Sequence, residues 1–85
     1  MKMSRNEIFE KLKEIILSAD ESIAYRFPSL DEDTRILEDL GFTSIGMLFM
    51  AVSIEETFQI KLDDVNIWDL HVLGDAVTMI EGKTA

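Results

Sequence analysis

The sequence predicts an all-α fold with four helices, in which a long loop joins the first two helices and the third helix is short. In residues 5–18 and 44–58, apolar side chains recur at the spacing of an amphipathic helix. The chain has 85 residues, 47% of them hydrophobic, which is enough for one packed core. We therefore expect a single domain that spans residues 1–85.

The first helix is predicted from Arg5 to Ser18. Ser4 followed three residues later by Glu7 has the pattern of a capping box, in which each of the two residues satisfies a backbone N–H of the other. The apolar residues behind this start recur at helical spacing: Ile8, Phe9, Leu12, Ile15 and Ile16. We expect these side chains to face the core.

A long connection is predicted from Ala19 to Thr43, where the helical periodicity fails. Pro28 and the acidic run after Leu30 mark it as a loop, with a short helical turn near residues 34–37. Loops of this length in a small domain are usually functional. We expect its apolar residues to pack onto the core: Ile23, Tyr25, Phe27, Ile36, Leu37 and Leu40.

The second helix is predicted from Ser44 to Phe58, after a tight turn at Gly41, with Thr43 or Ser44 as its N-cap. Two apolar stripes run along it. The stripe expected to face the core consists of Met47, Met50, Ala51, Ile54 and Phe58. The other stripe, nearly opposite, consists of Ile45, Leu48, Phe49 and Val52. Because a surface helix normally has one apolar stripe, the second one predicts a surface for a partner.

Two shorter helices are predicted to follow. The first covers Asp64 to Leu70, with Trp68 as a partly buried anchor. The second covers Leu73 to Glu81, and Gly82 is the expected stop.

The charge of the chain excludes several classes of function. Seventeen Asp and Glu residues against eight Lys and Arg give a formal charge of −9, so the basic stripe that nucleic acids require is missing and anionic membranes repel the chain. Enzymes that bind it should carry Arg and Lys around their binding site. Self-repulsion also predicts a fold that salt stabilises.

Without cysteines, a signal peptide or a bilayer-spanning apolar stretch, we expect a cytoplasmic monomer.

Side chains for catalysis or metal binding are scarce in the sequence. The acidic run from Asp31 suggests a calcium loop, but an EF-hand needs Gly and Glu where this chain has Ile36 and Phe42. His71 is the only histidine and is expected at the surface or as a cap, and Ser44 has no evident general base. We therefore expect no metal site and no enzymatic activity.

Three segments of the chain resemble the acyl carrier proteins. Asp39-Leu40-Gly41-Phe42-Thr43-Ser44-Ile45 is similar to the family's Asp-Leu-Gly-x-Asp-Ser-Leu, and Ile54-Glu55-Glu56-Thr57-Phe58 follows at the family's distance for Leu-Glu-Glu-x-Phe. Leu73-Gly74-Asp75-Ala76-Val77 is similar to the Val-Gly-Asp-Ala-Val before the family's last helix. The resemblance runs without a gap from residue 39 to residue 80, and the predicted first helix fits the family as well.

This resemblance implies a right-handed four-helix bundle and a carrier rather than an enzyme. A phosphopantetheinyl transferase would use magnesium to attach a 4'-phosphopantetheine arm from coenzyme A to Ser44, and the thiol of the arm would carry acyl groups as thioesters. Acyl-loading, acyl-transfer or condensing enzymes would bind the second helix. The expected docking residues are Thr43, Ile45, Leu48, Phe49, Val52, Glu55 and Glu56. Independently of the family, a helix N-terminus favours an anionic phosphodiester at Ser44.

The chain also departs from the family pattern. Thr43 stands where most fatty-acid carriers have Asp, and Gly46 and Phe49 occupy positions that are often acidic. These changes favour a carrier of a specialised fatty acid, polyketide or related pathway, with docking that relies on apolar contacts more than on charge. Two alternatives stay open at this point: a peptidyl or aminoacyl carrier of a nonribosomal peptide pathway, and an unmodified helical protein-interaction domain.

Overall fold

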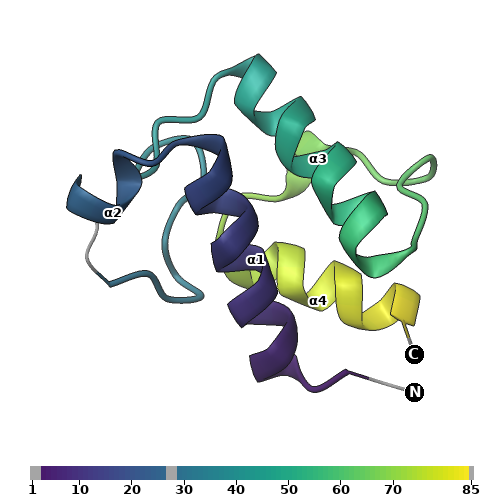
Figure 1. The fold of residues 1–85 in the computed structure, drawn as a ribbon. Helices are drawn as coiled ribbons and strands as arrows, with labels where there is room; N and C mark the ends of the chain where they lie inside the picture. The colour runs from purple at the N-terminus through teal and green to yellow at the C-terminus, as the bar shows by residue number, and fades with distance from the viewer. Residues whose placement is uncertain (1–2, 27–28, 85) are drawn as a thin grey trace.

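The structure, a computed structural model, describes residues 3–26 and 29–84 (Figure 1). Its elements are α1 (Arg5–Ala19), α2 (Ile23–Arg26), α3 (Ser44–Phe58), the 3₁₀ helix η1 (Ile67–Asp69) and α4 (Leu73–Thr84). Within these described residues, β-type pairing is limited to an isolated bridge between Arg35 and Val72. The predicted all-α class is therefore confirmed.

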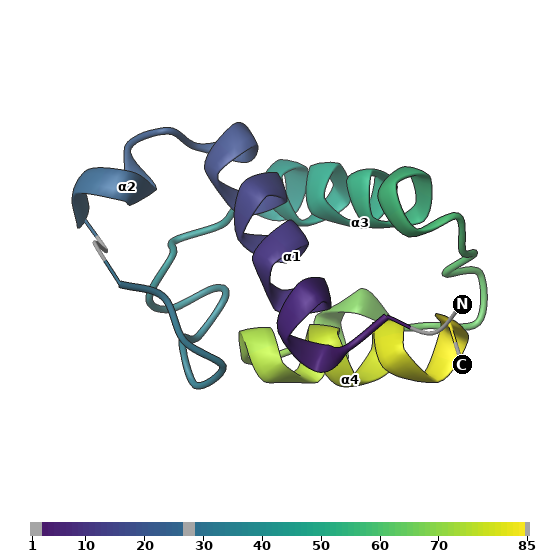
Figure 2. The same ribbon diagram turned by 60° about the horizontal axis from the view of Figure 1, so that its bottom comes forward.

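Helix α1 lies across α3 and α4, as Figure 2 shows, and the core forms where these three helices meet. Each helix contributes a stripe of apolar side chains that water does not reach. The stripes are Ile8, Leu12 and Ile16 from α1, Met47, Met50 and Ile54 from α3, and Leu73, Val77 and Ile80 from α4. For α1 and α3, these are positions that the helical spacing assigned to the core.

The capping box predicted for α1 is present. The Ser4 hydroxyl accepts a hydrogen bond from the Glu7 N–H at 3.2 Å, and the Glu7 carboxylate accepts one from the Ser4 N–H at 3.1 Å. The bond from the Ser4 backbone holds the pKa of Glu7 below its ordinary value. The helix ends at Ala19, one residue after the predicted end.

The connection between α1 and α3 contains a helix that the sequence analysis missed. Asp20 initiates α2, because its carboxylate accepts hydrogen bonds from the N–H and the hydroxyl of Ser22 at 3.0 and 2.7 Å. The helical turn expected near residues 34–37 is instead a series of hydrogen-bonded turns over residues 36–40. This correction has a physical reason: Arg35 pairs with Val72, which fixes the backbone in an extended conformation at that point.

The apolar residues of this connection divide into buried and exposed ones. Ile23, Ile36 and Leu40 are buried as predicted. The prediction was wrong for Tyr25, which is 88% exposed, and for Leu37, which is 42% exposed. Phe27 and Pro28, which the predictions also used, lie outside the described residues.

The last two helices differ in length from the prediction. The third is a single 3₁₀ turn, Ile67–Asp69. The Trp68 side chain within it is 45% exposed and is therefore only partly buried. Helix α4 continues through Gly82 to Thr84, so Gly82 does not end it. The Thr84 hydroxyl donates to the Ile80 carbonyl at 2.9 Å, and Lys83 pairs with Asp64 at 2.7 Å, which together hold the last turn.

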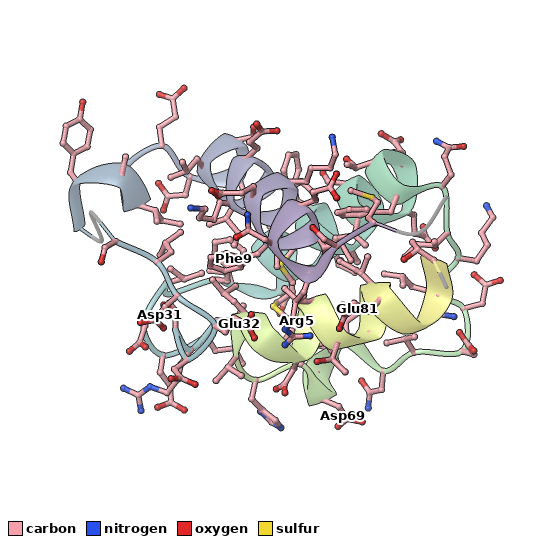
Figure 3. All side chains as sticks on the ribbon, turned by 90° about the horizontal axis from the view of Figure 1, so that it is seen from below. Arg5, Phe9, Asp31, Glu32, Asp69 and Glu81 are labelled. Carbon is pink, nitrogen blue, oxygen red and sulfur yellow. The ribbon has the colours of Figure 1, made fainter. Side chains whose placement is uncertain are left out.

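Arg5 joins the start of α1 to two distant parts of the chain (Figure 3). Its guanidinium contacts the Glu32 carboxylate at 2.5 Å and the Glu81 carboxylate at 2.6 Å. It also donates to the Thr78 hydroxyl and the Gly74 carbonyl, at 3.1 and 3.3 Å. Hydrogen bonds to Glu32 and then to Glu81 raise the pKa of Arg5 above its ordinary value. The cluster thus fastens both the long connection and α4 to α1.

Candidate functional site

Ser44 is the first residue of α3, and its side chain is exposed. The N-cap is Thr43, whose hydroxyl accepts a hydrogen bond from the Gly46 N–H at 3.3 Å. The sequence left open whether Thr43 or Ser44 caps the helix, and the geometry selects Thr43. The Ser44 hydroxyl therefore forms no hydrogen bond to any residue that the structure describes, and it stays available at the helix start.

A turn held by contacts between Arg35 and Asp39 precedes α3 and positions its start. The Arg35 N–H donates to the Asp39 carboxylate at 2.8 Å, and the Arg35 guanidinium contacts the same carboxylate at 3.0 Å. The hydrogen bonds from the Arg35 side chain and then from its backbone hold the pKa of Asp39 below its ordinary value. Gly41 ends the turn with φ of 69°, a left-handed conformation that glycine adopts without strain.

Backbone hydrogen bonds tie the same segment to the start of α4. The Ile36 N–H donates to the His71 carbonyl at 2.9 Å, and the Leu73 N–H donates to the Thr34 carbonyl at 3.0 Å. The Gly74 N–H donates to the Glu32 carbonyl at 2.8 Å. The segment before Ser44 is therefore held by the body of the fold.

The exposed stripe on α3 is where the sequence placed it. The exposed fractions are 79% for Ile45, 58% for Leu48, 45% for Phe49 and 53% for Val52. The long connection therefore does not cover this face of α3. The helix is thus apolar on both sides, although only one side is buried.

The two acidic residues near the end of α3 differ in their roles. Glu56 is exposed. Glu55 is half-buried, and its carboxylate accepts a hydrogen bond from the Leu62 N–H at 2.8 Å. Glu55 thus holds the segment after α3, in addition to the docking role expected for it.

The start of α3 is electrostatically suited to an anion. The free N–H groups of a first helical turn carry a partial positive charge, and no acidic side chain lies in the first turn of α3 to offset it. Thr43 is neutral as well. An anionic group on the Ser44 hydroxyl would therefore be stabilised there.

His71 and possible metal ligands were also candidates for a chemical role. His71 is exposed at the start of α4, where the Asp75 carboxylate accepts hydrogen bonds from the N–H groups of His71 and Val72 at 2.9 and 3.1 Å. Asp75, not His71, therefore caps this helix. Among the described residues, no three His, Cys, Asp or Glu side chains gather at metal-binding distance, and none of the helices is long and apolar enough to cross a membrane.

A groove that was not predicted from the sequence opens beside the start of α3. It has a volume of about 300 Å³ and lies between the end of α1, the turn at residues 41–43 and the first two turns of α3. Gly46 inside α3 was the available signal, because a glycine in a helix exposes whatever lies beside it. Here that neighbour is Phe42, whose ring is mostly buried.

Comparison with known proteins identifies the family. Residues 10–80 match the family described as "Phosphopantetheine attachment site". The acyl carrier protein of Thermotoga maritima is 35% identical over 83 residues, which cover 94% of this chain and 95% of that protein. The acyl carrier protein of Aster yellows witches'-broom phytoplasma is 36% identical over 81 residues, covering 92% of this chain and 99% of that protein. The acyl carrier protein of an Arthrobacter species is 32% identical over 82 residues, which cover 96% of this chain and 98% of that protein.

These matches confirm the predicted family, cofactor and carrier role. The site fits the phosphopantetheine group, because Ser44 is exposed at the start of a helix whose first turn contains no acidic side chain to offset its partial positive charge. The chain belongs to the acyl carrier proteins, which carry a covalently attached 4'-phosphopantetheine arm and act as partners of enzymes rather than as catalysts.

Proposed function

We propose that Ser44 is the residue that receives the arm. The observation that supports it is that the Ser44 hydroxyl is exposed at the start of α3 and is not used to cap the helix. A phosphopantetheinyl transferase joins the Ser44 oxygen to the phosphorus of the pantetheine phosphate of coenzyme A. The phosphoanhydride bond to adenosine 3',5'-bisphosphate breaks, this nucleotide leaves, and the hydroxyl proton passes to the transferase.

The residues of the chain then hold and present the attached group. The first-turn N–H groups of α3 stabilise the negative charge of the phosphodiester. Thr43 keeps the helix start intact without adding a competing negative charge. The turn that ends at Gly41 fixes the direction in which Ser44 points. When bound, the arm supplies a thiol that carries acyl groups as thioesters, which this cysteine-free chain does not itself provide.

The partner surface in this proposal is the outer face of α3. Its docking residues are Thr43, Ile45, Leu48, Phe49, Val52, Glu55 and Glu56. The four apolar members of this set are all at least 45% exposed, and they begin next to Ser44. Because α3 has no basic residue and the chain carries a formal charge of −9, the fitting partner has an apolar centre with Arg and Lys around it.

The pathway in this proposal is a specialised one, within fatty acid, polyketide or related biosynthesis. Thr43, Gly46 and Phe49 support it, since they leave the first half of α3 without an acidic residue and so change what a partner recognises. The name of the relatives, acyl carrier protein, favours an acyl cargo over a peptidyl or aminoacyl one. The proposal includes a single domain, a monomer and a cytoplasmic location.

Intact mass spectrometry tests the attachment. The chain is incubated with a phosphopantetheinyl transferase, magnesium and coenzyme A, and it should gain the mass of one arm. Ser44→Ala should gain nothing, while Ser53→Ala, which removes a hydroxyl from the middle of the same helix, should gain one arm. A wild-type mass that stays unchanged would support the unmodified interaction domain instead. Modification of Ser44→Ala would reject the assignment to Ser44.

A further inference from the structure

The groove beside Ser44 is bounded by residues from three parts of the fold. They are Ala19 and Asp20 at the end of α1, Gly41 to Thr43 in the turn, and Ile45, Gly46 and Phe49 on α3. Ser44 does not itself line the groove, but its two neighbours in the chain, Thr43 and Ile45, both do. A group attached to Ser44 therefore begins at the mouth of the groove.

The groove exists because two of its residues are small. A Cβ at residue 46 would lie 3.3 Å from Cγ of Phe42, so the absence of a side chain at Gly46 leaves the Phe42 ring facing the space. On the α1 side of the groove, Ala19 has only a methyl side chain. Phe49 closes one side, with 45% of its surface still exposed.

The described residues that line the groove are mostly apolar, and Asp20 is the charged one among them. Its carboxylate already accepts two hydrogen bonds from Ser22. None of these described lining residues is basic. The groove therefore favours a neutral group with apolar surface, and it disfavours a phosphate or another anion.

The arm has such a group close to its phosphate. The phosphate is followed by a methylene group, then by a carbon that carries two methyl groups, and then by a hydroxyl and amide groups. We propose that the groove between α1 and α3 holds this dimethyl segment while the phosphate stays at the N-terminus of α3. This inference rests on the proposed attachment at Ser44.

Covalent attachment makes a small groove sufficient. Because the arm is tethered beside the groove, docking costs little further translational and rotational freedom, so burial of the two methyl groups can favour the docked arm several-fold. The effect is to direct the rest of the arm toward the α1 side of α3.

The alternative position of the arm is along the other side of the exposed stripe of α3. Leu48 lies one turn after Ser44 on α3 and is 58% exposed, and Val52 lies one turn further and is 53% exposed. Neither of them lines the groove. Leu48 and Phe49 are therefore a matched pair: adjacent, apolar and exposed, with only Phe49 at the groove.

Isotope-filtered nuclear Overhauser spectroscopy on the full chain distinguishes these two positions of the arm. Isotope-labelled protein is given an unlabelled arm, and intact mass confirms that one arm is attached. The arm's methyl protons should show contacts to Ala19, Gly46 and the Phe49 ring. Phe49→Ala should abolish most of these contacts, whereas Leu48→Ala should keep them.

The outcomes separate this inference from the one on which it rests. If the mass does not increase, the attachment fails and the groove proposal falls with it. If the mass increases and the methyl contacts go to Leu48 and Val52, or are absent, the attachment stands and the groove proposal is wrong. It is equally wrong if Leu48→Ala removes as many contacts as Phe49→Ala.

Discussion

At the scale of single residues, Thr43 and Ser44 divide two tasks between adjacent hydroxyls. Thr43 accepts the hydrogen bond that a helix start requires, and this leaves the neighbouring hydroxyl at the surface. In many sequences a serine at such a position would itself be the cap. The separation of tasks is what makes Ser44 a candidate for modification rather than for structure.

Replacement of Thr43 by alanine should destabilise the fold, because the Thr43 hydroxyl is the cap of α3. The variant leaves the Gly46 N–H without its cap, which should lower the free energy of unfolding by about 1 kcal/mol. Urea denaturation monitored by circular dichroism measures the loss. Thr43→Ser keeps the cap and should unfold close to the wild type; an equal loss in both variants would show that the hydroxyl is not the cause.

The ion pair of Asp39 should make part of the stability depend on pH. Hydrogen bonds from Arg35 lower the pKa of Asp39 in the folded state below its ordinary value of 3.8. Its contribution is therefore present above pH 3.8, and it is lost as the pH falls through the lower folded-state pKa. The difference in unfolding free energy between the wild type and Asp39→Asn should be largest near neutral pH and should vanish in strong acid. A difference that grows on acidification would contradict this.

At the scale of elements, two glycines of α4 should respond to alanine in opposite ways. A Cβ at Gly74 would lie 3.1 Å from the Glu32 carbonyl oxygen, whereas a Cβ at Gly82 would have nothing within 4 Å. Gly74→Ala should cost about 1–3 kcal/mol, because backbone must move. Gly82→Ala should gain up to about 1 kcal/mol, since alanine favours a helix interior. Denaturation midpoints of the two variants test the pair, and equal midpoints would refute the close approach at Gly74.

A charged substitution in the exposed apolar stripe of α3 should weaken the binding of partner enzymes. Val52→Glu places a carboxylate on the outer face, away from both Ser44 and the groove, and it should lower kcat/KM of the phosphopantetheinyl transferase on the order of tenfold. Asn6→Glu adds the same charge to α1 and serves as the control. If the two variants behaved alike, net charge rather than the α3 surface would explain the effect.

How far the sequence predicts each element depends on which contacts form it. Helix α3 has the predicted bounds, Ser44 to Phe58, because local signals set both of its ends. Helix α2 was missed because a single carboxylate, Asp20, initiates it without any periodic pattern. The turn of α4 past Gly82 includes the pairing of Lys83 with Asp64, a contact between residues 19 positions apart in the sequence. Such contacts have no local signature.

The candidate site was predictable to a similar extent. Ser44 and the exposed stripe follow from motif and periodicity, and both lie on α3 at the expected places. For the groove, Gly46 was the only local signal, and the position of the groove was not predictable, because Ala19 and Gly46 come together only when α1 packs beside α3.

At the scale of the whole molecule, the excess of negative charge should make stability depend on salt. The molecule measures 34 × 24 × 19 Å, and the Debye length falls from about 30 Å at 0.01 M to about 8 Å at 0.15 M ionic strength. Repulsion across the whole molecule therefore acts at low salt and is screened at higher salt. The attractive pairs at Arg5, at 2.5 and 2.6 Å, are much shorter than either length and lose less.

Raising sodium chloride from about 0.01 M to about 0.15 M should therefore raise Tm. A gain of roughly 4–8 °C would correspond to about 1 kcal/mol in a domain of this size. Differential scanning calorimetry gives the shift, and magnesium chloride at the same ionic strength should act at least as strongly. An unchanged or lower Tm would mean that the local ion pairs outweigh the repulsion.

The contact between Arg5 and Glu81 brings the beginning of the first helix close to the end of the last one. Figure 1 shows both at the lower part of the molecule, whereas α3 begins at the top. A tether that continues from the start of α1 or from the end of α4 would therefore leave the fold away from the start of α3, where Ser44 lies. The protein can thus be joined to another polypeptide in either order, or immobilised, while its serine hydroxyl still faces incoming enzymes.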